Sequence, residues 1–570
     1  MKNSLLSNKK TSAIGVVILT LLLLSSSVYA GEQPTAASSA NLLRQGEKMY
    51  REGILPSGQP MQAMVSGDVP VSGTAFTCIS CHLQSGLGSV EGTVVTPPTT
   101  GKILYQPKDI YKKDFEMVES VRRYSKALPM RPAYTDESLA AAISGGVDPA
   151  GRTMNRAMPV YALSDQDMAI LINYLKNLSA EISPGVSEAE IRFATVITDE
   201  VSERDVAAML APLEYTISRK NSTAGLYKTN PRLSKMAVRM MGPDLVAKRF
   251  TLAKWRLQGP PGTWQTQLED YYRREPVFAL LGGITSGEWQ PVHQFCEENH
   301  LPCLFPSTDF PVRSKSDWYT QYFSKGIYQE GEAAARYLNL QVGPAVDREI
   351  IQVVRQSPRG AALAEGFRDT WVALGHVTPV IISLQGVEPW GGESMRLALD
   401  RQKPTAILLW DDGAGALATL SMLTTETNRP RLVFTSASYL GSALNNIPEA
   451  ARDFTYISYP HRLPQEDARY DTLLNPMTRG LDLSGEARTY FEQAYSVGDI
   501  MSRALVDMRG EYYRDFFLDN IGMMGDQDLP LYERLSFGPG QRYAAKGCYI
   551  VQLGQGPEPL LVKKSEWVVN

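Results

Sequence analysis

The five residues Cys78-Ile79-Ser80-Cys81-His82 constrain this chain more than any other part of its sequence. Two thiols three positions apart can reach neighbouring substituents on one edge of a porphyrin, and the histidine that follows can bind the iron. This spacing is the attachment signature of c-type haem. A redox dithiol would need a βαβ context and a zinc site a second ligand pair, and neither occurs nearby. The sequence therefore predicts a domain folded around one covalently bound haem c, attached at Cys78 and Cys81, with His82 as an iron ligand.

The N-terminus has the pattern of an export signal. Three lysines precede an apolar run at 13–24, and the small residues Val28 and Ala30 precede Gly31. The run is shorter than the ~20 residues of a membrane-spanning helix, and no cysteine follows it for lipid attachment. We expect residues 1–30 to be a cleaved signal peptide that sends the protein to a bacterial periplasm. The alternative is an uncleaved membrane anchor.

Length and charge limit the remaining possibilities. A chain of 570 residues is long enough for two or three domains. Its net charge of −4 comes without a long basic block, which excludes an extended nucleic-acid-binding surface. Residues 180–188 are polar and contain Pro184-Gly185, as expected of a linker. The linker would divide a haem domain at 31–179 from a second domain at 189–570.

Two helices are expected to flank the haem motif. Apolar spacing predicts one at 41–52, and Ser164, followed by acidic residues, caps a second with an apolar side. In this arrangement residues 31–179 resemble class I cytochromes c. The resemblance implies an all-α domain whose terminal helices cross, with Gly46 permitting their close approach. It also implies electron transfer, which needs a redox partner protein.

The sixth iron ligand is expected to be a methionine. Every histidine other than His82 lies far downstream in the sequence. The pair Met158-Pro159, just before the last helix, is similar to the segment that supplies the axial thioether in the resembled family, and Met/His ligation is common. Met154 and Met130 are the alternatives, and Met158 as core filler is another.

The resemblance also implies a hydrogen bond to the other nitrogen of His82. In the family this comes from a proline carbonyl shortly after the motif, a place that Pro97 or Pro98 fits; such contacts orient an iron ligand. With both axial positions filled, the iron has no open site for a substrate. We therefore expect an electron carrier rather than an enzyme.

The second domain alternates short β-rich runs with helical stretches. This order predicts α/β architecture with parallel sheets. The expected strands are 191–197, 250–257, 277–284, 303–305, 349–354, 378–384, 406–410 and 431–435.

Several segments of this domain resemble type I periplasmic binding proteins, the branched-chain amino-acid and amide receptors of ABC importers. The segments are 282–288, 294–298, 301–307, 328–338, 537–542 and 566–568. The resemblance implies two lobes with a ligand cleft between them, chain crossings near 325–328, 459–463 and 536–540, and an ABC permease as a partner. The region Leu210 to Pro243 departs from the family.

Candidate ligand contacts follow the ends of predicted strands. Ser286 is placed between a strand and a helix, where its hydroxyl and the amide of Gly287 would favour an anion; a plain N-cap is the alternative. Amino-acid-binding members of the family carry an acid for the ligand's ammonium near Ser438. This sequence has none there, which counts against an amino-acid ligand unless Asp309 or Asp411 substitutes. Trp410 is either a contact or strand core. The full set is Ser286, Gly287, Ser307, Thr308, Asp309, Trp410, Asp411 and Ser438.

Three cysteines remain outside the haem motif. Cys296 and Cys303 bracket a helix-to-strand connection, and an oxidising compartment favours a disulfide between them. Two free buried thiols are the alternative. Cys548 is expected to be free and buried.

Three functions fit this sequence. The first is a periplasmic redox protein whose second domain binds or senses a small molecule. The second is an electron-transfer partner of an exported dehydrogenase, such as a quinoprotein, with the second domain as a docking scaffold. The third is a solute receptor for an importer that carries an accessory cytochrome. Fold resemblance alone does not choose among them.

Overall fold

The computed structural model describes residues 36–66, 68–91, 94–107, 131–314, 316–342, 350–538 and 540–569. The expected signal peptide at 1–30 and Met130 lie outside these residues. The chain divides into two compact units, one of Met1–His82 and Gly88–Ala180, the other of Leu83–Leu87 and Glu181–Asn570. No helix in the described part of the chain has the length and apolar character needed to cross a membrane.

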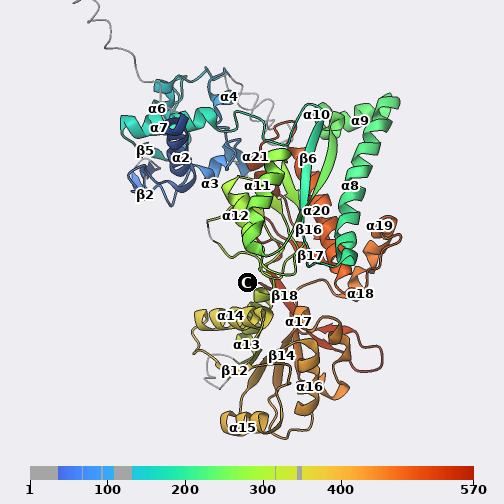
Figure 1. Cartoon of the computed structure of the whole chain (residues 1–570). Coiled ribbons are helices and arrows are strands. Elements are labelled where there is room, and N and C mark those ends of the chain that lie inside the picture. Colours follow the sequence, from blue (N-terminus) through green and yellow to red (C-terminus); the bar gives the residue numbers. More distant parts are fainter. Residues whose placement is uncertain are drawn as a thin grey trace, which may run out of the picture. The chain divides into compact units, whose positions relative to one another are not determined.

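Two crossing helices organise the first unit (Figure 1). These are α2 (Ala36–Glu52) and α7 (Asp165–Asn177). They pack at Gly46, where a Cβ atom would lie only 2.5 Å from the Cβ of Tyr174. The hydroxyl of Ser164 caps α7 by accepting from the amide of Asp167. Both features agree with the sequence expectations, because caps and small-residue crossings depend on local sequence.

The first unit also contains strands, so the expectation of an all-α domain is wrong. Strand β1 pairs with β2 and β5 in a three-stranded antiparallel sheet, and β3 pairs with β4. The long segment between α2 and the haem motif forms the β1–β2 hairpin, and β5 precedes α7. The bounds are β1 (Gln62–Val65), β2 (Val69–Ser72), β3 (Ser89–Glu91), β4 (Val94–Thr96), β5 (Val160–Ala162), α3 (Ile79–His82), α4 (Gly101–Leu104) and α6 (Asp136–Gly145).

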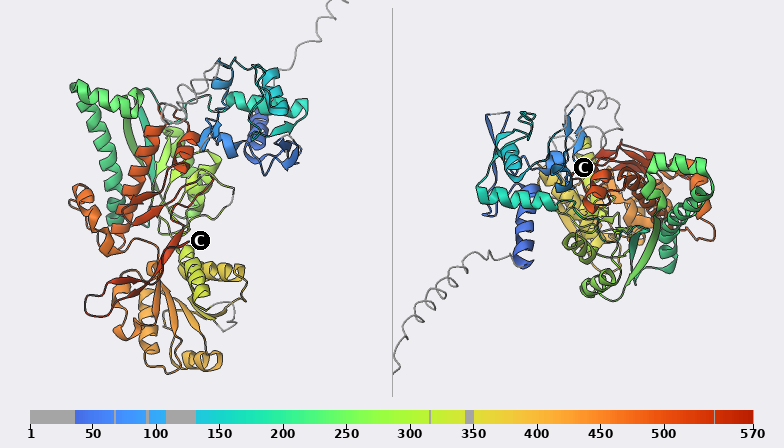
Figure 2. Two further views of the ribbon diagram at one scale, coloured as in Figure 1. Left: turned by 180° about the vertical axis from the view of Figure 1, so that it is seen from behind. Right: turned by 90° about the horizontal axis from the view of Figure 1, so that it is seen from above.

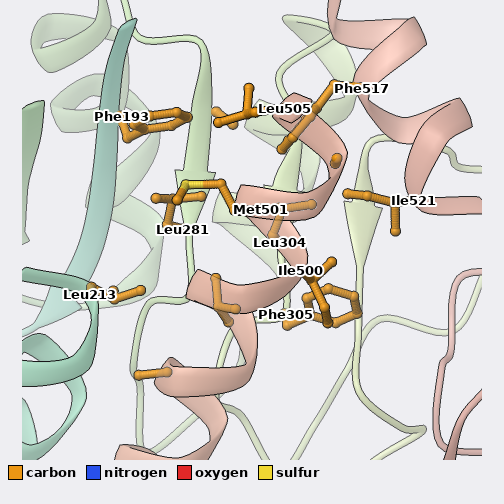
Figure 3. Packing of buried hydrophobic residues seen from close by; sticks show 14 of the residues in the cluster. Phe193, Leu213, Leu281, Leu304, Phe305, Ile500, Met501, Leu505, Phe517 and Ile521 are labelled. Atoms are coloured by element: carbon orange, nitrogen blue, oxygen red, sulfur yellow. The ribbon is translucent and has the colours of Figure 1, made fainter. Parts of the chain in front are cut away.

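The first lobe of the second unit is built on a parallel sheet with strand order β10-β9-β8-β6-β7. Figure 3 shows Phe193, Leu281 and Leu304 from three of these strands facing apolar residues of α20. The strands are β6 (Glu190–Thr198), β7 (Arg249–Leu257), β8 (Ala279–Leu281), β9 (Cys303–Leu304) and β10 (Thr320–Gln321). The helices are α8 (Glu203–Thr229), α9 (Pro231–Met241), α10 (Pro243–Ala247), α11 (Trp264–Arg274), α12 (Gln290–Glu298), α20 (Ala487–Asp507) and α21 (Arg514–Gly522).

The second lobe has an eight-stranded sheet whose first four ladders are parallel. Helices α13 and α14 pack on one side of it and α15 and α16 on the other (Figures 1 and 2). The strands are β11 (Ile350–Arg355), β12 (Val380–Leu384), β13 (Ala406–Trp410), β14 (Leu432–Ser436), β15 (Thr455–Tyr459), β18 (Gly547–Leu553), β19 (Leu561–Lys563) and β20 (Val568–Val569). The helices are α13 (Ile327–Val342), α14 (Pro358–Ala373), α15 (Gly392–Gln402), α16 (Gly413–Leu423) and α17 (Ala437–Leu440).

The chain passes between the lobes after β10, after β15 and before β18. Main-chain hydrogen bonds join the chain segments near two of these passages. Tyr322 forms a β-bridge with Tyr543, and the amide of Arg462 donates to the carbonyl of Leu531. Short elements fill the remaining connections: α18 (Pro464–Asp467), α19 (Asp471–Leu474), β16 (Gln527–Leu529), β17 (Tyr532–Leu535) and the 3-10 turns at Pro261–Thr263, Gly441–Asn446, Glu449–Ala451, Ala468–Tyr470 and Asn475–Met477.

Part of the expected linker at 180–188 is held against the second unit. The amide of Ser183 donates to the carbonyl of Tyr512, and its hydroxyl accepts from the amide of Arg514. Gly185 has a φ of 86°, and a Cβ there would lie 2.1 Å from the backbone nitrogen of Phe278. Because only glycine fits this close approach, Pro184-Gly185 anchors the start of the second unit.

Candidate functional site

The first unit contains an apolar pocket behind the haem motif. It is lined by residues of α2, α6 and α7 together with the segments that follow the motif and precede β5. The lining residues are Tyr50, Cys78, His82, Pro97, Pro98, Thr99, Ile103, Leu104, Arg131, Tyr134, Leu139, Ala142, Ile143, Met154, Met158, Tyr161, Leu171 and Leu175. The crossing of α2 and α7 therefore forms one wall of the pocket.

His82 is oriented as an iron ligand. Its side chain is buried, and Nδ1 lies 2.8 Å from the carbonyl oxygen of Pro97. A carbonyl only accepts, so Nδ1 carries the proton and Nε2 keeps its lone pair. Nε2 is buried without a hydrogen-bond partner in the described structure. An iron in the pocket would satisfy that atom. Burial lowers the pKa of His82, which favours the neutral imidazole that binds metal.

Cys78 directly precedes the one-turn helix α3, and Cys81 lies within it. Cys78 lines the pocket, and burial raises the pKa of its thiol to about 12. Cys81 is exposed. An unmodified thiol in this apolar site would be unreactive, so its burial suits a thioether bond better than redox chemistry.

Met158 and Met154 both line the pocket. The amide of Met158 donates to the carbonyl of Asn155 and closes a turn. The next residue, Pro159, is buried. Thus the pocket contains an imidazole nitrogen and two thioethers, and its remaining lining is largely apolar. The residues fit a haem with Met/His ligation.

Arg131 was not identified from the sequence. Its side chain is buried beside the pocket and donates to the carbonyls of Ile103, Leu104 and Gln106. These bonds hold the short helix α4 and the loop that follows it. A lone arginine between two prolines gives no periodic or motif signal, and its partners lie more than twenty residues earlier in the chain.

In the second unit, Ser286 is not at a helix N-terminus, which corrects the sequence prediction. Helix α12 begins at Gln290, and Ser286 is exposed in the preceding loop. The amide of Gly287 donates to the hydroxyl of Thr285, so it is already used within the loop. The backbone field of a helix end therefore does not act at Ser286.

Asp309 lies where the lobes meet. It accepts from Arg359 of α14 in the second lobe, with Oδ2 2.7 Å from Nε and 2.6 Å from a terminal nitrogen. Arg359 also lies 3.8 Å from the carboxylate of Glu486, at the start of α20 in the first lobe. The three side chains are 31–53% exposed. This inter-lobe cluster, defined as Asp309, Arg359 and Glu486, has two carboxylates for one guanidinium.

Two other predicted residues lie in the first lobe close to Asp309 in sequence. The hydroxyl of Ser307 is buried and donates to Gln493 of α20, whose amide in turn donates to the hydroxyl of Tyr532. The hydroxyl of Thr308 donates to the carbonyl of Gly287. These bonds fix the loop that carries Asp309.

Trp410 and Asp411 are core residues, so their prediction as ligand contacts is wrong. The indole nitrogen of Trp410 donates to the side chain of Gln352, and both residues are fully buried. Asp411 accepts two hydrogen bonds from Arg355, at 2.7 and 2.8 Å. A carboxylate whose charge and lone pairs are satisfied inside the core is a structural group.

Ser438 has an acidic neighbour after all. Its amide lies 3.4 Å from Oε2 of Glu330, which also accepts from the hydroxyl of Ser436. Glu330 comes from α13 and is almost fully buried, and this burial raises its pKa to about 7. The acid was missed because it lies in a distant part of the sequence.

The predicted disulfide is absent from the structure. Cys296 and Cys303 are free and fully buried, and Cys548 is free and buried as expected. Burial raises the pKa of Cys296 well above its ordinary value, and a hydrogen bond with Cys303 adds to this effect. The two thiols are therefore neighbours in an apolar core.

Comparisons with known proteins give one family model and a set of similar solved structures. Residues 74–179 match the family model for cytochrome c. Among solved structures, the chain is similar to a branched-chain amino acid ABC transporter protein from Thermus thermophilus with bound valine, at 13% identity and a TM-score of 0.47 over 67% of this chain and 97% of that one. It is also similar to a fatty acid ABC transporter substrate-binding protein from Thermomonospora curvata, at 16% identity and a TM-score of 0.43 over 68% and 95%.

A third similar structure is a solute-binding protein of an ABC transporter from R. palustris in complex with benzoate, at 12% identity and a TM-score of 0.44 over 67% of this chain and 98% of that one. A search of curated protein sequences finds no match. A cytochrome c domain therefore occupies residues 74–179.

Proposed function

We propose that this protein is an exported electron carrier with one covalently bound haem c and that its second unit binds a small molecule between two lobes. The observation that carries the first part is the buried Nε2 of His82, which has no hydrogen-bond partner among the described residues and belongs to a residue lining an apolar pocket. Met158 is our proposed sixth ligand. When bound, the haem would accept and release one electron at its iron.

Each residue around the pocket has a definite task in this proposal. Cys78 and Cys81 would form the thioether bonds. The carbonyl of Pro97 holds the imidazole of His82 in one tautomer and orientation. The apolar lining excludes water, and a soft thioether ligand raises the reduction potential relative to a second histidine. With both axial positions filled, the iron would have no open coordination site, so we expect outer-sphere electron transfer to a redox partner protein.

Two matched methionine variants test this assignment. Met158→Ala should abolish the weak near-infrared methionine-to-iron band of the oxidised protein and allow carbon monoxide to bind the reduced protein. Met154→Ala removes an equal thioether from the same pocket and should keep the band. If Met154→Ala loses the band and Met158→Ala keeps it, the ligand assignment is wrong; if neither variant loses it, methionine ligation by either residue is wrong.

For the second unit, the inter-lobe cluster supports a ligand that carries an ammonium group. The cluster has an excess carboxylate, and its side chains are partly exposed at the meeting of the lobes. An ammonium would compensate Asp309 or Glu486, and a carboxylate on the same ligand could accept from Arg359. This replaces the anion expected at Ser286, where no helix terminus lies. Such ligands close two-lobed proteins by binding both lobes at once.

A thermal-shift screen of the holoprotein tests this second part. Small amines, the matching carboxylic acids and the matching zwitterions would be compared by the melting of the second unit, followed separately from the haem absorbance. Amines and zwitterions should stabilise the protein, acids alone should not, and Asp309→Asn should abolish the effect. Stabilisation by acids alone would contradict the assignment. No response from any compound would favour a docking scaffold for a redox partner over a small-molecule receptor.

A further inference from the structure

Helix α9 is a well-specified helix with an unusual exposed surface. Asn230 caps it by accepting from the amides of Arg232 and Leu233, Pro231 occupies the first turn, and Gly242 ends it. Figures 1 and 2 show it at the outer end of α8, on the periphery of the first lobe. It lies in the part of the sequence that departs from the resembled receptor family. The cap and the proline fix the helix locally, so its exposed residues are free to serve another purpose.

The side of α9 that packs on the protein is narrow. Ala237 is buried, and Ser234, Val238 and Met241 are partly buried. These four residues recur at helical spacing and form one stripe. Folding therefore uses only this stripe, and the opposite side of the helix faces solvent.

The solvent-facing side is divided into an apolar half and a basic half. Leu233, Met236 and Met240 are spaced i, i+3, i+7 and are 39%, 56% and 61% exposed. Arg232, Lys235 and Arg239 have the same spacing, one position earlier, and are also exposed. The two stripes run side by side along the helix. The helix contains no acidic residue.

Contacts among the residues that the structure describes explain neither stripe. None of the three cations forms an ion pair or a side-chain hydrogen bond with any residue that the structure describes. The three apolar side chains are left in water, which favours their transfer to an apolar medium. A surface that complements this side of α9 must offer negative charge and hydrocarbon next to each other.

We propose that α9 docks the protein on a membrane surface containing anionic phospholipids. Phosphate groups would accept from the basic stripe while Met236, Met240 and Leu233 enter the boundary between headgroups and acyl chains. Protein interfaces are enriched in aromatic residues, and α9 has none, so a fluid surface fits its exposed side better than an acidic protein does. Flexible methionines adapt readily to such a medium.

The test is binding of the full-length holoprotein to vesicles by co-sedimentation. Vesicles of phosphatidylglycerol and phosphatidylcholine in equal parts would be compared with pure phosphatidylcholine. We expect binding only to the anionic vesicles, with a marked loss at 0.5 M salt, where charge attraction is screened within about 4 Å. Each cation near an anionic surface increases partitioning onto it about fivefold. The triple variant Arg232→Gln/Lys235→Gln/Arg239→Gln should therefore bind anionic vesicles at least about tenfold more weakly than wild type.

Matched controls separate the helix from general effects. Arg273→Gln/Arg396→Gln/Arg534→Gln removes the same charge from three ion-paired arginines elsewhere and should bind as wild type does. Met236→Gln/Met240→Gln should reduce binding severalfold, whereas Val387→Gln, at an 87% exposed position in the other lobe, should not. Equal losses in helix and control variants, or no binding to anionic vesicles, would overturn the proposal. Binding of α9 to an acidic redox partner instead would do the same.

Discussion

Replacing Gly46 by alanine tests how closely the two crossing helices must pack to form the haem pocket. The new methyl carbon would lie 2.5 Å from the Cβ of Tyr174 and 2.9 Å from the carbonyl oxygen of Ile170. Ordinary contacts between carbon atoms are about 3.5–4.0 Å, so α2 and α7 must separate by about 1 Å. Overpacking of this kind costs about 1–3 kcal/mol. Alanine returns about 1 kcal/mol through its higher helix propensity, which leaves a net loss of about 0–2 kcal/mol relative to wild type and of about 1–3 kcal/mol relative to an alanine variant without the clash.

Gly145 provides the matched control. It is also a helical glycine of the first unit, in α6, but a Cβ there would meet no atom within 4 Å. Gly145→Ala therefore keeps the propensity gain without the clash and should be neutral or slightly stabilising, by at most about 1 kcal/mol.

Guanidinium unfolding followed by haem absorbance is the appropriate assay, because it reports the haem-binding unit alone. Tyr50 of α2 and Leu171 of α7 both line the pocket. Separation of the helices should therefore also weaken the methionine-to-iron band of Gly46→Ala before global unfolding. If Gly46→Ala is as stable as Gly145→Ala, the inferred close packing of the helices is wrong.

Two further predictions concern the second unit. Burial raises the pKa of Glu330 to about 7, so the folded protein holds this proton more tightly than the unfolded chain, and stability should fall as pH rises from about 4.5 towards 7. Glu330→Gln should reduce this pH dependence only in part, because burial also raises the pKa of Glu492 to about 7. At pH 8 the free energy of unfolding of Glu330→Gln should exceed that of wild type by up to about 3 kcal/mol. An unchanged pH dependence in urea unfolding would contradict this. Thiol titration of the denatured, unreduced holoprotein should find the three cysteines outside the haem motif reactive, whereas a single thiol would restore the disulfide predicted from the sequence.

The sequence predicted those parts of the fold that depend on neighbouring residues. The haem motif, the Ser164 cap and the small residue at the helix crossing are local signals, and each has the expected place in the structure. The sheet of the first unit was not predictable in the same way. Strand β5 pairs with β1 through residues almost a hundred positions apart, such as Ala63 and Tyr161, and the long segment before the motif was equally compatible with a loop.

The ligand site shows both kinds of error. For Ser286 the sequence contained the correct signal, because Pro291 is favoured in the first turn of a helix and therefore places its start near Gln290. For Asp411 it contained none. The partner of Asp411 is Arg355 on the neighbouring strand β11, and the adjacency of β11 and β13 is set by the sheet topology. A polar residue after a strand is thus a site candidate only once the neighbouring strand is known.

The acid near Ser438 could not be predicted for the same reason, and its position bears on the choice of ligand. Glu330 reaches Ser438 from a helix 108 positions earlier in the chain, so the absence of a local acid does not exclude an ammonium group. Glu330 itself is a poor acceptor, since it is 1% exposed and already bound to Ser436 and Ser438. Asp309 is 31% exposed and shares a single guanidinium with Glu486. Solvent access and unbalanced charge therefore favour Asp309 as the group that meets a ligand, while Glu330 stabilises the loop after β14 from within.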